Sequence, residues 1–195
     1  MKSMFPLCFE YLSNFKKELI EKKKRYKTNT TYWYALHCPR QITMFEEEKI
    51  ITPEISLGCN MSYDKEYLYH NTKCYTIIFN EEQKHKTLAY LAILNSPVMW
   101  FFLSETGYVL RGGFFCFKTK YIGGFPIPNL SEGDVKALSE LASQMLEAHN
   151  ELEKTKFEND KKFLQQRIDI LDSQINAIVY SLYGLNEEEI KIVEG

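Results

Sequence analysis

The sequence lacks the residue patterns that mark the commonest catalytic and metal-binding sites. Its five cysteines are scattered without a Cys-x-x-Cys pair, and its four histidines form no His-x-x-His or His-Glu-x-x-His motif. We therefore expect reduced structural thiols and no metal site. No glycine-rich phosphate loop, Gly-x-Ser-x-Gly elbow or Gly-x-Gly-x-x-Gly motif occurs either. These absences argue against an autonomous enzyme, and no cofactor is expected in this chain.

Long apolar runs and a signal peptide are missing too. The longest apolar run, residues 98–103, falls well short of the roughly 20 residues that a bilayer span needs. A cytoplasmic location is therefore the expectation. With 195 residues, 45% of them hydrophobic and 26% charged, the chain has room for one globular domain, or for one domain with a helical appendage.

The net charge of −2 conceals a gradient along the chain. Residues 1–30 hold eight Lys or Arg against three Glu, whereas residues 131–195 hold seven against fourteen Asp or Glu. Such asymmetry is typical of a nucleic-acid face at one end and a protein-facing surface at the other. The alternative is that the charged faces of different helices simply differ.

Three regions follow from the changes of pattern. Residues 1–29 are predicted to form a linker, up to about residue 8, and a basic amphipathic helix from Phe9 to about Tyr26. Its basic end, Lys22–Arg25, suits either the helix dipole or DNA phosphates. Residues 30–130 are predicted to be a β-rich core, and residues 131–195 a helical hairpin. The predicted fold class is therefore α+β, with a mixed or antiparallel β-rich core that includes one or two helices.

Short segments rich in aromatic and β-branched residues predict the strands of this core. A helix-like run from Lys86 to Phe102 is interrupted by Asn95-Ser96-Pro97, so a helix that restarts at Pro97 is expected. The predicted strands are Trp33–Leu36, Lys49–Thr52, Tyr67–Tyr69, Cys74–Phe79 and Phe114–Phe117.

The last third of the chain predicts two long helices that pack antiparallel. Ser131 is placed to cap the first helix, and the polar stretch 156–162 permits the reversal. Gly184 is expected to end the second helix, and Asn186 with Glu189 to cap a last short one. The second helix carries a heptad seam formed by Leu164, Ile168, Leu171, Ile175, Ile178 and Leu182.

Aromatic residues interleaved with basic ones are concentrated between residues 108 and 121. A strand here would place Phe115, Phe117 and Thr119 on one face, and Lys118 and Lys120 on the other. Arginine is the side chain best suited to a two-pronged contact with guanine, and the glycines after Arg111 would let the backbone approach a groove. An ordinary amphipathic hairpin is the alternative interpretation. A second polar and aromatic hairpin around residues 63–69 could serve the same purpose.

Several short motifs, taken in order, resemble one family. They match the C-terminal specificity domain of TaqI-type adenine-N6 DNA methyltransferases and of the fused type IIG restriction-modification enzymes built on them. The resemblance covers nearly the whole chain. The residues that carry it are Trp33-Tyr34, Leu36, Arg40, Lys49-Ile50, Pro53, Ile55-Ser56, Tyr90-Leu91, Ile93-Leu94-Asn95-Ser96, Arg111-Gly112-Gly113, Phe117, Thr119, Tyr121-Ile122, Phe125-Pro126-Ile127-Pro128 and the closing stretch from Ile175 to Glu189.

The resemblance implies a module that recognises a short sequence in double-stranded DNA. It also implies that the module follows, in the same chain, a methyltransferase domain that binds S-adenosylmethionine and flips the target adenine. Some parents add a nuclease that uses Mg. No Asn-Pro-Pro motif of the catalytic domain occurs here, so this chain is expected to have no methyltransferase or nuclease activity of its own. The helices after Pro128 are similar to the spacer helices of type I specificity subunits, which dock against partner domains.

The family supplies no base-reading residues that can be transferred, so the candidates come from side-chain chemistry. Arg40 and Trp33 have a structural interpretation as well. The main alternative function is a helical assembly module without base readout, for which a weak dimer through the C-terminal hairpin would be the sign. The DNA-binding candidates are Arg111, Lys118, Lys120 and Tyr121, with Arg40, Lys49, Tyr63 and Lys65 as second choices.

Overall fold

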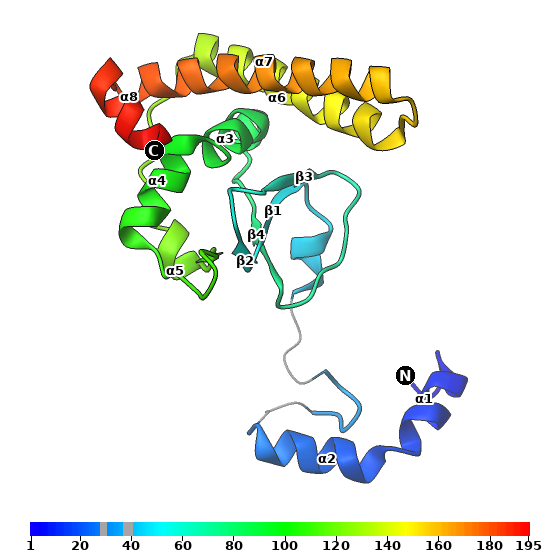
Figure 1. Cartoon of the computed structure of the whole chain (residues 1–195). Coiled ribbons are helices and arrows are strands. Elements are labelled where there is room, and N and C mark those ends of the chain that lie inside the picture. The colour runs from blue at the N-terminus through cyan, green and yellow to red at the C-terminus, as the bar shows by residue number, and fades with distance from the viewer. Residues whose placement is uncertain (28–30, 37–40) are drawn as a thin grey trace. The chain divides into compact units, whose positions relative to one another are not determined.

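The computed structural model describes residues 1–27, 31–36 and 41–195. These group into two compact units, Met1–Met44 and Phe45–Gly195. The α+β class is confirmed, since helices and two small antiparallel sheets build the second unit (Figure 1).

The first unit contains two helices where the sequence predicted one. Helix α1 spans Pro6–Ser13 and α2 spans Lys16–Arg25, with the break at Asn14 and Phe15. Proline is favoured in the first turn because its missing N–H would have no helical partner there. The helical structure therefore begins at Pro6, inside the segment expected to be a linker.

The strand predicted at Trp33–Leu36 is wrong, because residues 31–36 form bends and turns. The rings of Trp33 and Tyr34 instead pack against Phe9 of α1, each with a centroid separation of 5.7 Å. Aromatic residues favour strands only where a pleated neighbour offers them a packing surface, and here a helix provides that surface.

The larger sheet of the second unit has three antiparallel strands in the order β3-β1-β4. Strand β1 is central, and its Ile50 pairs with Tyr63 on one side and Ile77 on the other. A smaller two-stranded sheet pairs β2 with β5. The predicted strands near residues 49, 74 and 114 are thus confirmed, the last two in shortened form. The strands are β1 (Lys49–Pro53), β2 (Ile55–Ser56), β3 (Ser62–Asp64), β4 (Cys74–Ile77) and β5 (Phe115–Cys116).

The strand predicted at Tyr67–Tyr69 is also wrong. Tyr67 has a φ of 60°, in the left-handed region that a strand residue does not adopt. The carboxylate of Asp64 accepts the backbone N–H groups of Glu66 and Leu68, both at 2.9 Å. An aspartate that bonds its own following backbone forms a turn in place of a strand.

The interrupted helix in the middle of the chain is confirmed. Helix α3 spans Thr87–Leu94 and α4 restarts at Pro97 and ends at Thr106. All residues of α3 except Leu88 are buried, so it forms the centre of the core. Three short helical segments complete this part: Ile42–Phe45, Lys84–Lys86 and α5 (Thr119–Ile122).

The C-terminal helices confirm their predicted caps and seam. Helices α6 (Glu132–Lys154) and α7 (Glu158–Leu182) lie side by side across α3 (Figure 1). Ser131 and Asn186 each form a reciprocal capping box, the second one before α8 (Glu187–Glu194). Gly184 adopts a φ of 67° after α7. The seam residues buried within α7 include Leu164, Ile168, Leu171 and Ile175.

Within the described ranges, no single helix is long and apolar enough to cross a membrane. The pair Lys84–Leu94 and Pro97–Thr106, bent by 67°, meets the criterion of length and composition only jointly. In the same residues, no three His, Cys, Asp or Glu side chains come together as metal ligands.

Candidate nucleic-acid interface

The segment around Arg111 folds into a tight hairpin that leads into β5. The N–H of Leu110 bonds to the carbonyl of Phe114 at 2.7 Å, and the N–H of Gly113 bonds back to the carbonyl of Leu110 at 3.2 Å. Gly112 and Gly113 have φ angles of 88° and 80°, which L side chains rarely adopt. The two glycines therefore make the turn possible, and Arg111 lies exposed at its tip.

The end of β5 carries the lysines predicted from the sequence, but not as a continued strand. Phe115, Cys116 and Phe117 are all buried, so the expected alternation of faces does not hold. Helix α5 begins at Thr119, so Lys118 lies just before it and Lys120 lies within it, and both side chains are exposed. The Nζ of Lys120 lies 5.5 Å from the ring centroid of Tyr121.

Tyr121 is stacked on a ring from the hairpin. Its centroid lies 6.3 Å from that of Tyr108, with 18° between the ring planes. The N–H of Cys116 bonds to the carbonyl of Tyr108 at 3.1 Å. This stack ties Tyr121 of α5 to Tyr108, which precedes the turn at Arg111.

A carboxylate orders two of the cations near this surface. Glu54, 17% exposed, lies 3.1 Å from the Nζ of Lys73 and 3.6 Å from that of Lys118. The hydrogen bond from Lys73 lowers the pKa of Glu54, so the carboxylate stays charged. Neither Glu54 nor Lys73 was predicted as a site residue, because they are far from Lys118 in sequence and no motif links the three.

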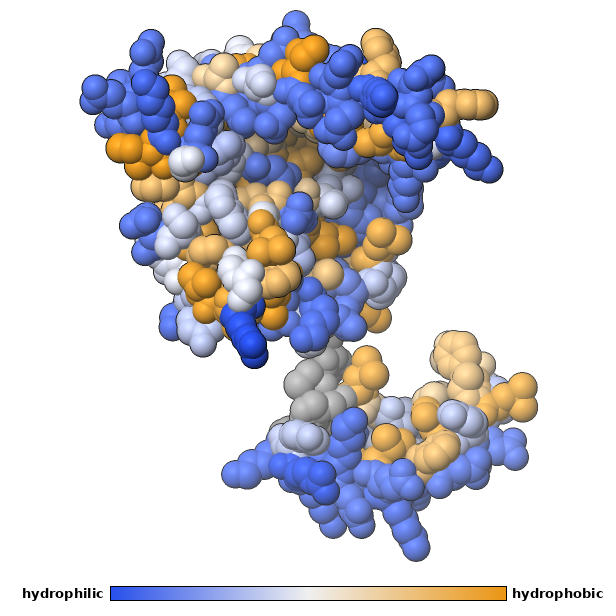
Figure 2. Space-filling view, in the orientation of Figure 1, coloured by the Kyte–Doolittle hydropathy of each residue, from blue (hydrophilic) through white to orange (hydrophobic). Residues whose placement is uncertain are grey.

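Apolar side chains are exposed beside these cations. Four of them, in or next to β2 and on the hairpin, are 38% to 58% exposed: Ile55, Leu57, Val109 and Phe114. The space-filling view shows hydrophobic and hydrophilic residues interleaved around β2 and α5 (Figure 2). Apolar side chains that flank cations can contact thymine methyl groups and sugars while the cations meet phosphates. We name the surface formed by residues 108–114 and 118–121 with Ile55, Leu57 and Lys73 the hairpin face.

The second-choice residues do not join the hairpin face. Lys49 is fully buried, and its ammonium pairs with Asp64 at 2.6 Å and bonds to the carbonyls of Phe45 and Glu47. The expectation that Lys49 contacts DNA therefore conflicts with its position, because a sequence pattern does not distinguish a buried strand lysine from a surface one. Arg40 lies outside the described residues.

Tyr63 and Lys65 lie on a different surface, beside a groove between β3 and α6. The Tyr63 hydroxyl donates to Glu48 at 2.6 Å. Burial and this carboxylate raise the pKa of Tyr63 to about 12, so the phenol stays neutral.

Comparisons with known proteins agree with the resemblance. Residues 6–127 match the family model described as the TaqI-like C-terminal specificity domain. The whole chain is similar to the type II restriction enzyme and methyltransferase RM.Eco57I of Escherichia coli, at 25% identity over 210 residues and 21% of that protein. For the type II methyltransferase M.XhoI of Xanthomonas vasicola the identity is 26% over 170 residues, covering 86% of this chain and 26% of the relative. The chain thus spans about a fifth to a quarter of the length of these two relatives. Since the family model covers more than half of the chain, the protein belongs to the TaqI-like C-terminal specificity domain family.

Proposed function

We propose that this chain is the DNA target-recognition module of a restriction-modification methyltransferase. The membership in a specificity-domain family supports this function, and both relatives are named methyltransferases. The structural observation that carries the proposal is the hairpin face, where Arg111 lies exposed on a turn closed by two backbone hydrogen bonds and the following segment exposes Lys118 and Lys120. A turn closed by hydrogen bonds matters because base readout requires a defined direction of approach.

The side chains of the hairpin face divide into two kinds of contact. Arg111 suits a bidentate contact with guanine in the major groove, because its planar guanidinium matches the two acceptors of that base. Lys118 and Lys120 suit phosphates, which fix the register of the domain on the duplex. Tyr121 is held by its stack with Tyr108 and positions Lys120.

The remaining candidates are secondary DNA contacts in the proposal. Tyr63 and Lys65 keep their place as second choices, and so does Arg40. Lys49 is omitted because its ammonium has no access to the surface.

The methylation chemistry is proposed for the parent protein. An attached methyltransferase domain would bind S-adenosylmethionine and flip the adenine, and Mg would serve a nuclease where the parent has one. This chain would then choose the site, in the cytoplasm where such enzymes meet DNA. A single module offers only part of the contact area of a whole enzyme, so weak binding by the isolated chain is expected.

A titration monitored by fluorescence anisotropy tests this function. The chain is titrated into a randomised labelled duplex at several salt concentrations, as wild type and as Arg111→Ala/Lys118→Ala. Binding should weaken with salt, and the variant should lower the slope of log K against log salt by up to about two.

The control variant is Lys136→Ala/Lys161→Ala, which removes the same charge from α6 and α7. Its binding should stay close to that of the wild type. Equal losses in both variants would remove the hairpin face from the proposal, and an absence of binding at low salt would contradict DNA recognition by this chain alone.

We also propose that the chain forms a weak dimer through the C-terminal hairpin. Phe163 and Ile170 lie one heptad apart on α7 and are 68% and 60% exposed. A weak dimer through this stripe would appear in sedimentation equilibrium and would be lost in Phe163→Gln/Ile170→Gln.

A further inference from the structure

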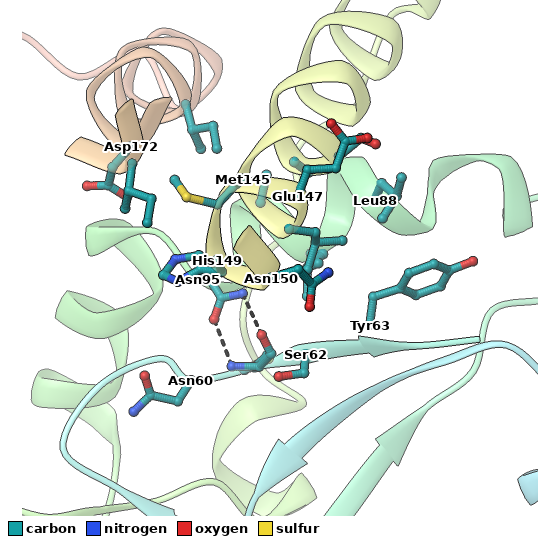
Figure 3. Close-up of a pocket in the computed structure, with 18 of the residues that line it drawn as sticks. Asn60, Ser62, Tyr63, Leu88, Asn95, Met145, Glu147, His149, Asn150 and Asp172 are labelled. Atoms are coloured by element: carbon teal, nitrogen blue, oxygen red, sulfur yellow. Dashed lines mark hydrogen bonds between the residues drawn. The ribbon is translucent and has the colours of Figure 1, made fainter. Parts of the chain in front are cut away.

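A groove of about 890 Å³ lies between the edge strand β3 and the α6/α7 helices. Figure 3 shows Tyr63 rising from β3 on one side, and Met145, Glu147 and His149 on α6 opposite it. Leu88 and Leu91 of α3 line its apolar part. The groove is separate from the hairpin face, since none of residues 107–121 lines it.

The β3 side of the groove is a sheet edge that is open at Tyr63. Met61, just before β3, has its N–H and carbonyl bonded to the side chain of Asn95, at 2.8 Å and 3.0 Å (Figure 3). Backbone groups alternate along a strand, so the N–H and carbonyl of Tyr63 point the same way as those of Met61. No described residue bonds to them on this side. Such an edge can accept a further strand.

The rim of the groove is acidic. Glu66, Glu147, Asp169 and Asp172 all line it, and none of the four forms an ion pair with a described residue. Among the residues that line the groove, Lys65 is the one lysine or arginine that opposes these carboxylates. DNA is therefore a poor occupant of the groove, and a cationic one is favoured. Any DNA contact by Tyr63 or Lys65 would have to be made outside the groove.

A pair of carboxylates on α7 also favours a positively charged occupant of the groove. Burial raises the pKa of Asp172, although Asn176 donates a hydrogen bond to it at 3.0 Å, and the nearby Asp169 adds repulsion. An ammonium or guanidinium group in the groove would offset the repulsion between Asp172 and Asp169.

We propose that this groove binds an extended, basic segment of a partner polypeptide, which adds as a strand to the edge at Tyr63. Main-chain bonds to β3 would give the segment its direction. Its alternate side chains would place lysine or arginine against the acidic rim and apolar groups against Leu88 and Leu91. This function lies beyond DNA recognition and does not depend on it.

The test uses a labelled peptide of about six residues in which lysine alternates with valine, titrated into the full chain and followed by anisotropy. The proposal expects saturable binding, and about tenfold weaker binding to Glu147→Gln/Asp172→Asn. The matched control is Glu140→Gln/Glu153→Gln, which removes the same charge from α6 outside the groove and should bind as the wild type does. In NMR spectra, the Tyr63 amide should shift and become protected from exchange.

A peptide of the same charge with proline at alternate positions tests the strand. Proline cannot donate to a strand ladder, so this peptide should bind much more weakly. Equal binding of both peptides, or displacement by spermine with the Tyr63 amide unchanged, would show a simple cation site and overturn the proposal. Failure of the lysine peptide to bind would overturn it as well. DNA binding in the groove variants should match that of the wild type, so the two functions can fail independently.

Discussion

At the scale of single residues, the Lys49–Asp64 pair is the clearest case of a charge used for structure. Both side chains are at most 4% exposed, and carbonyls of Phe45 and Glu47 take two further bonds from the ammonium. A buried pair adds little compared with apolar residues, but removal of one partner leaves an uncompensated charge. The pair thus fixes β1 to the turn that follows β3.

Lys49→Met should therefore destabilise the protein by about 3–5 kcal/mol, because Asp64 would stay buried without its cation. Urea unfolding of this variant beside Lys73→Met measures the effect. Lys73 also pairs with a carboxylate but is 74% exposed, and its loss should cost no more than about 1 kcal/mol. If the two variants lost similar amounts of unfolding free energy, the burial of Lys49 would not contribute to stability.

Acid should destabilise the protein through Asp64. Burial alone would raise the pKa of this carboxyl, but the hydrogen bonds from Lys49 and from the N–H groups of Glu66 and Leu68 outweigh it and hold the pKa below its usual value. Since the folded-state pKa is the lower one, the contribution is complete above the unfolded value of about 3.9 and is lost as pH falls through the folded value. The free energy of unfolding should drop below about pH 4, and drop less steeply in Asp64→Asn. If the unfolding free energies of the wild type and Asp64→Asn fell in parallel with pH, Asp64 would not be the source of the acid sensitivity.

At the scale of elements, the α6/α7 hairpin is stabilised by the seam that its sequence shows. Ile168 and Leu171 of α7 pack with Ala148 of α6 in a small cluster of their own, apart from the main core. A helix of this length depends on such packing more than on intrinsic propensity.

Leu171→Ala should lower the free energy of unfolding by about 2–5 kcal/mol, the usual cost of a cavity at a buried leucine. The adjacent Ile170→Ala is the matched control, because Ile170 is 60% exposed and should change stability by only about 0.5 kcal/mol. Chemical denaturation of the two variants compares them directly. If Ile170→Ala were the more damaging change, the assignment of the faces of α7 would be wrong.

The two-glycine hairpin should be sensitive to a single methyl group. Gly112 has a φ of 88°, so Gly112→Ala should cost about 1–2 kcal/mol or move the turn, although the added carbon would meet Phe114 only at 3.5 Å. DNA binding should then fall because Arg111 changes direction. Gly58→Ala is the control, since its added carbon would meet only Asn60, at 3.7 Å, and DNA binding should persist. Anisotropy with both variants measures this, and unchanged binding in Gly112→Ala would show that the turn does not position Arg111.

At the scale of the whole molecule, the parts predicted well are those whose signal is local. The heptad seam from Leu164, the cap at Ser131 and the restart at Pro97 each depend on neighbours within one helix. The aromatic segments at Trp33 and Tyr67 were misassigned because their structure depends on partners elsewhere, the helix α1 in one case and the turn at Asp64 in the other.

The candidate site was predictable only in part for the same reason. Arg111, Lys118, Lys120 and Tyr121 lie close in sequence, so a local pattern found them together. Lys73 and Lys118 both form ion pairs with Glu54, but the three residues are far apart in sequence and no motif links them. The buried state of Lys49 depends on its pairing with β3, which the sequence does not specify.

The central claim is that this chain selects a DNA sequence, and enrichment from a randomised duplex library measures it most directly. The full chain is used to select bound duplexes over several rounds at moderate salt, and the pool is sequenced beside one selected with Arg111→Ala. We predict one short enriched motif, with preference for guanine relaxed at a single position in the variant, as loss of a contact worth about 1–3 kcal/mol would produce. Binding that enriches no motif would contradict target recognition by this chain and leave only general affinity for DNA.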